Sequence, residues 1–436
     1  MPSRDPLLTD MDQASGWYGI LPSPAPANRL KGRQNADWVV AGAGVTGLGA
    51  ARRLAELERE ARVILLEQHR VGYGASGRNS GFIIDTPHLT EGFDAEYNQR
   101  VSRLVIAGLA ELERIVGKHA IECEWSRRGH LHAIVESRWI GNLEATCHML
   151  DSVNEDYEWI EGDVLADVVG SRHYHAAVYT PRTVLMNPAE LCRGLAETMP
   201  ENVEVYEESP VHRVEPGSPV HIECAEGSIT AKNVLLTTNS FTTALGFLKG
   251  RLFPMIAYCS LSRPLTDDEQ AAMRGAPEWG VTPAVSGGPT LRRTRSNRIV
   301  YRYGNRYSGD FRMSSGHKRK LRAIHEEFVH RRYPMLAKLE MEYTWGGVFC
   351  MTRNWASFFG RLEPGVFASG GYAGIGVPRG TISGALLAEY ASGGDSELIR
   401  DVLAVSGPER LPPAPALGLG VRANIWRYLH RARNER

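Results

Sequence analysis

The 436-residue sequence lacks the features that would mark a nucleic-acid-binding or membrane-spanning protein. Its 50 basic residues are balanced by 50 acidic ones, so composition provides no net field to attract nucleic acid or an acidic membrane. No apolar run reaches the ~18 residues of a spanning helix, and the first residues lack the basic and apolar regions of a signal peptide. We therefore expect a soluble, cytoplasmic protein with no nucleic-acid partner and no membrane span.

Cysteine is also scarce. None of the six forms a C-x-x-C pair: Cys123, Cys147, Cys192, Cys224, Cys259 and Cys350. This scatter is typical of reduced, structural thiols, and it predicts neither a disulfide framework nor a metal site. What the chain does have is 43% hydrophobic residues over a length sufficient for two or three domains.

A strand–turn–helix–strand pattern occupies residues 38–66. An apolar strand at 38–41 precedes a glycine-rich turn, a helix covers 46 to about 57, and a second apolar strand covers 63–66. This is a βαβ unit, which predicts an α/β fold with a parallel, Rossmann-like sheet. Residues 251–350 contain long strands and one helix instead, and predict a second domain built on a large mixed or antiparallel β-sheet with helices.

Pattern changes divide the chain into four parts. Residues 1–35 are polar and Pro-rich and are predicted to form an extended arm over the body of the protein. The tail is basic and is expected to be a solvated helix. The other parts interleave, with the following expected boundaries: a nucleotide-binding domain at 36–90, 186–250 and 351–405, a substrate-binding domain at 91–185 and 251–350, and the tail at 406–436.

The turn in the βαβ unit reads G-x-G-x-x-G, with Gly42, Gly44 and Gly47. Gly42 permits the tight turn, Gly44 lets the backbone approach a pyrophosphate, and Gly47 lets the helix pack on the strand. Glu67 ends the second strand about 20 residues after Gly47, where its carboxylate can accept ribose hydroxyl protons. The motif predicts an adenine dinucleotide, with FAD and NAD both allowed by these residues.

Two further glycine loops follow. "QHRVGYGASGRNSGFI" begins directly after Glu67. "YAGIGVPRG", at residues 372–380, follows a predicted pair of strands and precedes an apolar helix. Small residues in such loops allow close approach of a ligand, while Ser76, Arg78 and Asn79 can supply hydrogen bonds.

With these motifs the sequence resembles the D-amino-acid oxidase superfamily of FAD-dependent oxidoreductases, and within it the branch of gamma-glutamylputrescine oxidase-like amine oxidases. The matching segments include "VVAGAGVTGLGAARRL", "GASGRNSGFI", "VLLTTNSFT", "WGGVFCMTRNWASFFGRL" and "VFASGGYAGIGVPRGTISGALLAE". The resemblance implies an FAD-binding domain. It also implies oxidation of a C–N bond of an amine or amino acid by hydride transfer to flavin N5, with water hydrolysing the resulting imine.

The resemblance also implies which residues hold FAD. The ADP half would contact Gly42, Ala43, Gly44, Val45, Thr46, Gly47, Glu67 and Gln68. The pyrophosphate and ring would follow Gly74, Ala75, Ser76, Arg78, Asn79, Ser80 and Gly81. The adenine and the closing segment would involve Val211, Thr238, Asn239 and Ser240. The pyrimidine edge of the flavin would meet Gly374, Ile375, Gly376 and Val377.

The expected substrate contacts depart from the branch. They are Phe82, Tyr258, Arg302, Tyr303, Trp345, Met351 and Ile375. The branch usually has glutamine at the position of Phe82 and histidine at that of Ile375, so its substrate does not transfer to this chain. Gly347 stands at the position where some relatives attach FAD through cysteine, which predicts noncovalent FAD.

Two other functions remain open at this level. An FAD-binding subunit without turnover, supporting a larger complex, would also explain the altered pocket residues. A nicotinamide-dependent dehydrogenase would use the first glycine turn but would leave the late glycine loop without a role. The sequence does not identify the substrate, the catalytic residues, the electron acceptor or the oligomeric state.

Overall fold

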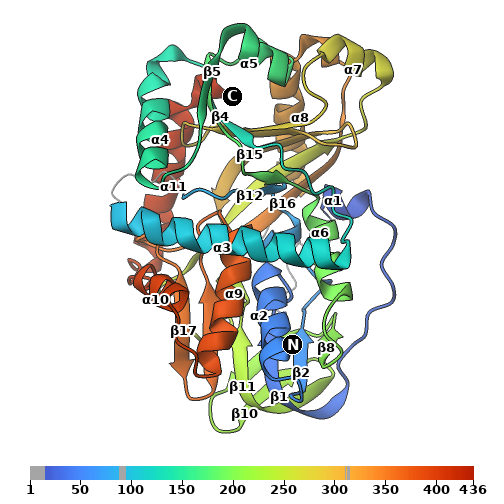
Figure 1. Ribbon diagram of the computed structural model, residues 1–436, viewed down its shortest axis with the longest axis vertical. Coiled ribbons are helices and arrows are strands. Elements are labelled where there is room, and N and C mark those ends of the chain that lie inside the picture. Colours follow the sequence, from blue (N-terminus) through green and yellow to red (C-terminus); the bar gives the residue numbers. More distant parts are fainter. Residues whose placement is uncertain (1–14, 88–94, 310, 312–314) are drawn as a thin grey trace.

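The computed structural model describes residues 15–87, 95–309, 311 and 315–436. The first fourteen residues of the predicted arm and residues 88–94, at the boundary between the first two expected domain segments, lie outside these ranges. Within them, the chain builds two eight-stranded sheets and a two-stranded ribbon. Figure 1 shows the first sheet in the lower half of the molecule and the second in the upper half.

The first sheet carries the βαβ unit. β1 and β2 pair in parallel, β1 also pairs in parallel with β11, and β11 with β18. The strand order in this sheet is β17-β18-β11-β1-β2-β8. In addition, β10 pairs with β11, and β9 pairs with β10. Their bounds are β17 Phe358–Glu363, β18 Val366–Gly370, β11 Gly227–Leu236, β1 Gly32–Ala41, β2 Val63–Leu66, β8 Val203–Tyr206, β10 Val220–Cys224 and β9 Val211–Glu215.

Helices cover one face of this sheet. α2 and α9 pack against each other there, and α3 lies across α9 (Figure 1). The central strands are apolar on both faces, as expected for parallel strands with both faces covered. All four residues of β2, for example, are buried. The predicted α/β class with a Rossmann-like parallel sheet is confirmed.

The second sheet is antiparallel except where β13 pairs with β4. Its order is β16-β12-β15-β14-β13-β4-β6-β5. The bounds are β16 Met341–Met351, β12 Phe253–Ser262, β15 Ile299–Tyr307, β14 Thr290–Arg293, β13 Trp279–Pro283, β4 His130–Ile134, β6 Ala176–Thr180 and β5 Glu158–Glu161. The ribbon of β3 (Phe82–Ile83) and β7 (Val184–Leu185) joins the glycine loop of the first domain to this part of the chain.

The helices and single-turn helices connect the strands. α6 begins with Asn187 as N-cap and Pro188 in the first turn, as these two residue types favour. The α-helices are α1 Gly16–Gly19, α2 Val45–Leu57, α3 Ala95–His119, α4 Ile140–Ser152, α5 Gly162–Val169, α6 Pro188–Glu197, α7 Asp267–Met273, α8 Ser315–Arg332, α9 Val377–Ala391, α10 Glu397–Ala404 and α11 Ala414–Arg431. The 3-10 helices are η1 Ala75–Gly77, η2 Ser137–Trp139, η3 Asn239–Thr243, η4 Pro334–Leu336 and η5 Arg433–Glu435. Among the described residues, no helix combines the length and apolar character that crossing a membrane requires.

The two faces of the second sheet differ. On the outer face, Tyr301 and Tyr303 pack with Phe328 of α8. On the other face, which we call the inner face, Cys259 and Trp345 pack with the N-terminal segment. Successive side chains along a strand point to opposite faces of the sheet. Every second residue of a strand therefore lies on the inner face.

Three segments depart from the sequence expectation. β1 begins at Gly32, six residues before the predicted start of the strand, because β11 continues alongside it. The arm contains the short helix α1, whose Trp17 is completely buried. The tail is not simply solvated, because the carboxylate of Glu435 accepts hydrogen bonds from the N–H groups of Val135 and Glu136 at 2.8 and 3.0 Å.

Helix α3, which the expected division assigned to the substrate-binding domain, packs with the first domain. Leu109, Leu112 and Ile115 lie in the same core cluster as α2 and the parallel strands. The long connection through α3 therefore lies on the helical layer of the first sheet before the chain enters the second.

The close approach of α2 and α9 gives a stability test. A Cβ at Gly384 of α9 would lie 1.9 Å from the carbonyl oxygen of Thr46 in α2, whereas a Cβ at Gly117 of α3 would meet nothing within 4 Å. We expect Gly384→Ala to lower the free energy of unfolding by roughly 1–3 kcal/mol through overpacking. Gly117→Ala should raise it by about 0.5–1 kcal/mol through helix propensity. Urea denaturation of both variants checks this, and an unchanged midpoint for Gly384→Ala would contradict the packing.

Candidate functional site

The first glycine turn has the geometry its sequence predicts. Gly42 has φ +102°, a conformation that L side chains rarely adopt, and a Cβ at Gly47 would lie 1.8 Å from the carbonyl oxygen of Gly42. A Cβ at Gly44 would lie 2.7 Å from Oγ of Ser76. That hydroxyl accepts a hydrogen bond from the N–H of Val45 at 3.0 Å, so the second loop meets the N-terminus of α2.

Glu67 lies at the end of β2, beside this turn. Its carboxylate accepts hydrogen bonds from the N–H of Ala43 at 2.9 Å and of His69 at 3.0 Å. Burial raises the pKa of Glu67, while these backbone donors oppose that shift. Each carboxylate oxygen has a second lone pair, so Glu67 can still accept from a ribose hydroxyl.

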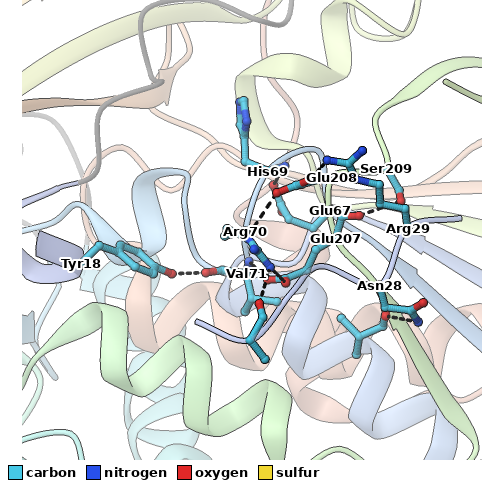
Figure 2. Close-up of polar contacts among 12 residues, drawn as sticks. Tyr18, Asn28, Arg29, Glu67, His69, Arg70, Val71, Glu207, Glu208 and Ser209 are labelled. Carbon is cyan, nitrogen blue, oxygen red and sulfur yellow. Dashed lines mark hydrogen bonds and ion pairs between the residues drawn. The ribbon is translucent and has the colours of Figure 1, made fainter. Parts of the chain in front are cut away.

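Charged residues hold the segments on either side of Glu67, as Figure 2 shows. Arg70 pairs with Glu207 at 2.6 Å, and the other oxygen of Glu207 accepts from the N–H of Val71. Ser209 donates its N–H to the carbonyl of Glu67 at 2.8 Å. Val211, the expected adenine contact, begins β9 two residues later.

The second glycine loop is held by its own polar side chains. Asn79 donates to the carbonyl of Ser76 at 2.6 Å and accepts from the N–H of Gly81 at 2.9 Å. Arg78 is buried and donates to the carbonyls of Tyr73 and Gly346. These side chains, which sequence reasoning assigned to FAD, thus also set the shape of the loop and attach it to β16.

The N-terminal arm supports the same loop, a role that the sequence did not reveal. Trp17 donates its indole N–H to the carbonyl of Asn79 at 2.8 Å, and Ser15 donates to the carbonyl of Gly77 at 3.0 Å. The hydroxyl of Tyr18 donates to the carbonyl of Val71. A tryptophan and a tyrosine in a Pro-rich segment were the only signal available.

The segment Thr238–Ser240 joins the early and late loops. Asn239 has φ +51°, and its side-chain oxygen accepts from the N–H of Gly371 at 3.1 Å. The preceding Thr237 donates to the carbonyls of Ala41 and Gly42. The loops that sequence reasoning predicted for FAD are therefore adjacent at the ends of the parallel strands, where such sheets bind ligands.

These loops leave room for a cofactor. A Cβ built at Gly74, Gly374 or Gly376 would meet no atom of the described residues within 4 Å. Gly376 is also the N-cap of α9, so the first backbone N–H groups of that helix are available to an acceptor. The space beside these glycines, the free helix N-terminus and the carboxylate of Glu67 fit FAD.

Arg292 connects the second loop to the second sheet, and sequence reasoning missed it. Its side chain is completely buried on the inner face of β14 and donates to the carbonyls of Gly81 at 2.8 Å and Met186 at 2.6 Å. Carboxylate oxygens of Glu278 and Glu124 lie 3.5 and 3.8 Å away. Burial lowers the pKa of Arg292 to about 10, which leaves it charged at neutral pH.

The seven expected substrate contacts separate into two groups. Phe82 lies against the inner face at Gly280, Arg302 lies on that face opposite Cys259, and Met351 continues the inner-face side of β16. The other four lie elsewhere, and their contact with a substrate stays a prediction. Tyr258 and Tyr303 lie on the outer face beside α8, Trp345 is buried against Trp17 with its indole bonded to Arg78, and Ile375 packs on the α3–α9 cluster.

A polar row crosses the inner face. His132 of β4 pairs with Thr282 of β13, and Thr290 of β14 pairs with Arg302 of β15. The row continues through Cys259, which pairs with both Arg302 and Trp345. Arg302 is half-buried, and among the residues that the structure describes its guanidinium has no hydrogen-bond or ion-pair partner.

Comparisons with known proteins agree with this site. Residues 37–390 match the family model DAO, described as FAD dependent oxidoreductase. The chain is 27% identical to "Probable oxidoreductase OrdL" of Haemophilus influenzae, over 84% of this chain and 85% of that protein. It is 26% identical to gamma-glutamylputrescine oxidoreductase of Escherichia coli, over 88% of this chain and 90% of that protein.

The fold has solved counterparts. Glycine oxidase from Geobacillus kaustophilus superposes with a TM-score of 0.73 at 17% identity, covering 87% of this chain and all of that structure. The matches confirm the predicted FAD cofactor and the predicted FAD-dependent oxidation of C–N bonds, and they do not favour the alternative of a non-catalytic subunit. The chain belongs to the DAO family of FAD-dependent oxidoreductases.

Proposed function

We propose that this enzyme oxidises a small amine that also carries a carboxylate, and that Arg302 binds the carboxylate. The observation that carries the proposal is the guanidinium of Arg302, half-buried and without a hydrogen-bonding or ion-pairing partner among the described residues. Burying a charge without a partner is costly, so such a cation is expected to receive an anionic ligand. A guanidinium binds a carboxylate through two parallel hydrogen bonds.

The names of the relatives support an amine substrate. One is a gamma-glutamylputrescine oxidoreductase and another structure is a glycine oxidase. The Phe82 and Ile375 positions differ from the sequence pattern of the first branch, so we do not extend its substrate to this chain. A carboxylate held by Arg302 instead favours an amino acid or N-substituted amino acid.

Each part of the site would then have a task. When bound, FAD accepts a hydride from the carbon that bears the amine. Arg302 fixes that carbon by holding the carboxylate, and the ring of Phe82 excludes water on the side of Gly280, where a Cβ would approach it to 2.4 Å. The N-terminus of α9, after Gly376, offers backbone donors to the negative charge that the reaction creates.

The cofactor is proposed to be noncovalent. Gly347 has no side chain with which to link it, and Cys350 is almost completely buried. Burial raises the pKa of the Cys350 thiol to about 12, so the nucleophilic thiolate is essentially absent at neutral pH.

Acid precipitation tests the noncovalent attachment. All yellow colour should remain in the supernatant, and mass spectrometry of the pellet should give the mass of the unmodified chain. Flavin retained in the precipitated protein would show a covalent link.

A second test introduces a side chain into the space expected to hold the cofactor. Gly376→Val should place a side chain where no protein atom lies within 4 Å, so the variant should fold but purify without FAD. Gly420→Val in the exposed part of α11 is the matched control, because its Cβ also meets nothing, and it should retain FAD. Absorbance at 450 nm and urea unfolding give both readouts. Stoichiometric FAD in Gly376→Val would place the flavin elsewhere.

The role of Arg302 is tested by kinetics. An anaerobic screen of amines and amino acids, read by bleaching of the flavin, first identifies a substrate. Arg302→Met should then raise KM for a carboxylated substrate roughly 10- to 100-fold, because a charge-assisted hydrogen bond contributes about 1.5–3 kcal/mol. The exposed Arg306→Met on the same strand should leave KM unchanged. Equal KM values for both variants would exclude Arg302 as the anchor.

A further inference from the structure

A continuous polar chain starts at Thr282 of the polar row, two strands and therefore roughly 10 Å from the backbone of Arg302, and leads away from it. Oγ1 of Thr282 lies 3.0 Å from Nδ1 of His132, and Nε2 of His132 lies 3.0 Å from Nε2 of His130. Nδ1 of His130 lies 2.9 Å from Oγ1 of Thr183, which donates to Oδ1 of Asp85 at 3.1 Å. Four separate segments of the sequence contribute to this chain.

The hydrogen bonds indicate the neutral form of each imidazole. Nδ1 of His130 lies 2.9 Å from Oγ1 of both Thr183 and Thr180. Because the hydroxyl proton of Thr183 goes to Asp85, a proton on Nδ1 of His130 provides both threonine oxygens with a donor, and we assign His130 this tautomer. Nε2 of His130 is then an acceptor and must receive the Nε2–H of His132. Nδ1 of His132 is left to accept from the hydroxyl of Thr282. Every link therefore points toward Asp85.

The far end of the chain reaches the surface. Asp85 is 1% exposed, and its second oxygen accepts from Arg182 at 3.1 Å. Arg182 also donates to Glu155 at 2.7 Å, and its own side chain is 41% exposed. A proton that arrives at Asp85 thus has a charged, partly solvated cluster through which to leave.

The near end of the chain faces the proposed substrate side. Thr282 and His132 are half-buried members of the row that contains Arg302. His130 is buried and lies edge to face with Phe82, their ring centres 6.1 Å apart. The chain therefore begins on the face that carries Arg302, two strands away, within reach of the amine of a substrate whose carboxylate is held by the long Arg302 side chain.

We propose that this chain, from Thr282 through His132, His130 and Thr183 to Asp85, removes the proton from the ammonium group of the substrate. The inference rests on the proposed oxidation of an amine. An ammonium group has no free electron pair, so it must lose a proton before its carbon can release a hydride.

The transfer balances at every atom. The substrate N–H bond breaks and its electron pair stays on nitrogen, while Oγ1 of Thr282 receives the proton and passes its own to Nδ1 of His132. Nε2–H of His132 moves to Nε2 of His130, and Nδ1–H of His130 moves to Thr183. The hydroxyl proton of Thr183 then converts Asp85 to its acid, which releases the proton to solvent.

Burial favours the neutral form of His130 in the resting state. Burial and the neighbouring His132 hold the pKa of His130 well below its usual range. The groups that face the pair are Arg292 on β14, Arg302 on β15, Asp85 after β3, Arg182 before β7 and Glu155 after α4. Tyr428 of α11 packs at the β13–β14 turn, where a Cβ at Gly287 would approach it to 2.7 Å.

The test is the pH dependence of flavin bleaching under single-turnover conditions. In the wild-type enzyme the rate should level off above a pH set by the chain. In His132→Gln it should fall roughly 10- to 100-fold at pH 7, within the usual range for proton-transfer groups. It should also keep rising until the free amine itself predominates in solution. Thr183→Val, which breaks the chain without altering an imidazole, should give the same profile even if His132→Gln folds poorly.

His325→Gln is the matched control. His325 is a buried histidine of the same domain that is also bonded to a hydroxyl, Oγ of Ser260 at 2.8 Å, but it lies on the α8 side of the sheet. It should keep the wild-type pH profile. A wild-type profile in both His132→Gln and Thr183→Val would overturn the relay while leaving amine oxidation intact. A wild-type flavin that no amine bleaches would instead overturn the proposed function and the relay with it.

A second readout does not depend on turnover. Nitrogen-15 NMR of histidine-labelled protein, assigned with the His130→Gln and His132→Gln variants, should show Nδ1–H on His130 and Nε2–H on His132 at neutral pH. The reverse tautomers would mean that a hydroxyl, of Thr180 or of Thr183, donates to Nδ1 of His130, which would overturn the direction of transfer.

Discussion

The buried guanidinium of Arg292 is the interaction on which the arrangement of the two domains around the site depends. It projects from the second sheet and donates to the carbonyls of Gly81 and Met186, which flank the β3–β7 ribbon. Removing one partner of a buried charged group typically costs about 3–5 kcal/mol, so this contact is hard to release. It holds the second glycine loop against the inner face, and therefore opposite Arg302 and the two histidines.

The two domains divide the chemistry. The first sheet, with the close α2–α9 contact at Gly384, brings three glycine loops from distant parts of the sequence to one edge. Together these loops form the binding site for FAD. The second sheet provides the proposed substrate contacts. Its inner face combines the guanidinium of Arg302, which has no ion-pair partner among the described residues, with a chain of hydroxyl and imidazole groups. Both proposals, for substrate binding and for proton removal, therefore concern one face of one sheet.

Much of the cofactor site could be predicted from sequence because its signals are local. Gly42, Gly44 and Gly47 lie in one turn, and the strand, the helix and Glu67 follow within about one βαβ unit. The substrate side could not be predicted in the same way. Tyr258 and Tyr303 are in the expected strands, but alternation and a bulge near Ala257 place them on the outer face. Nothing in the sequence reveals which of the two alternating sets of side chains on a strand faces the flavin.

Two kinds of residue were invisible for another reason. Arg292 looks like an exposed strand arginine until the loop that it binds is placed over it. His130 and His132 are two residues apart in a predicted strand, which indicates a shared face, but their partners Thr183, Thr282 and Asp85 come from distant segments. Such contacts arise from tertiary packing, and no local pattern encodes them.

A crystal structure of the FAD-loaded enzyme with a bound carboxylated amine tests the central claim most directly. The account predicts the flavin beside Gly74, Gly374 and Gly376, the ligand carboxylate paired with Arg302, and the amine nitrogen within hydrogen-bond distance of Thr282 Oγ1. A ligand whose carboxylate avoids Arg302, or whose amine lies away from the end of the histidine chain, would contradict it.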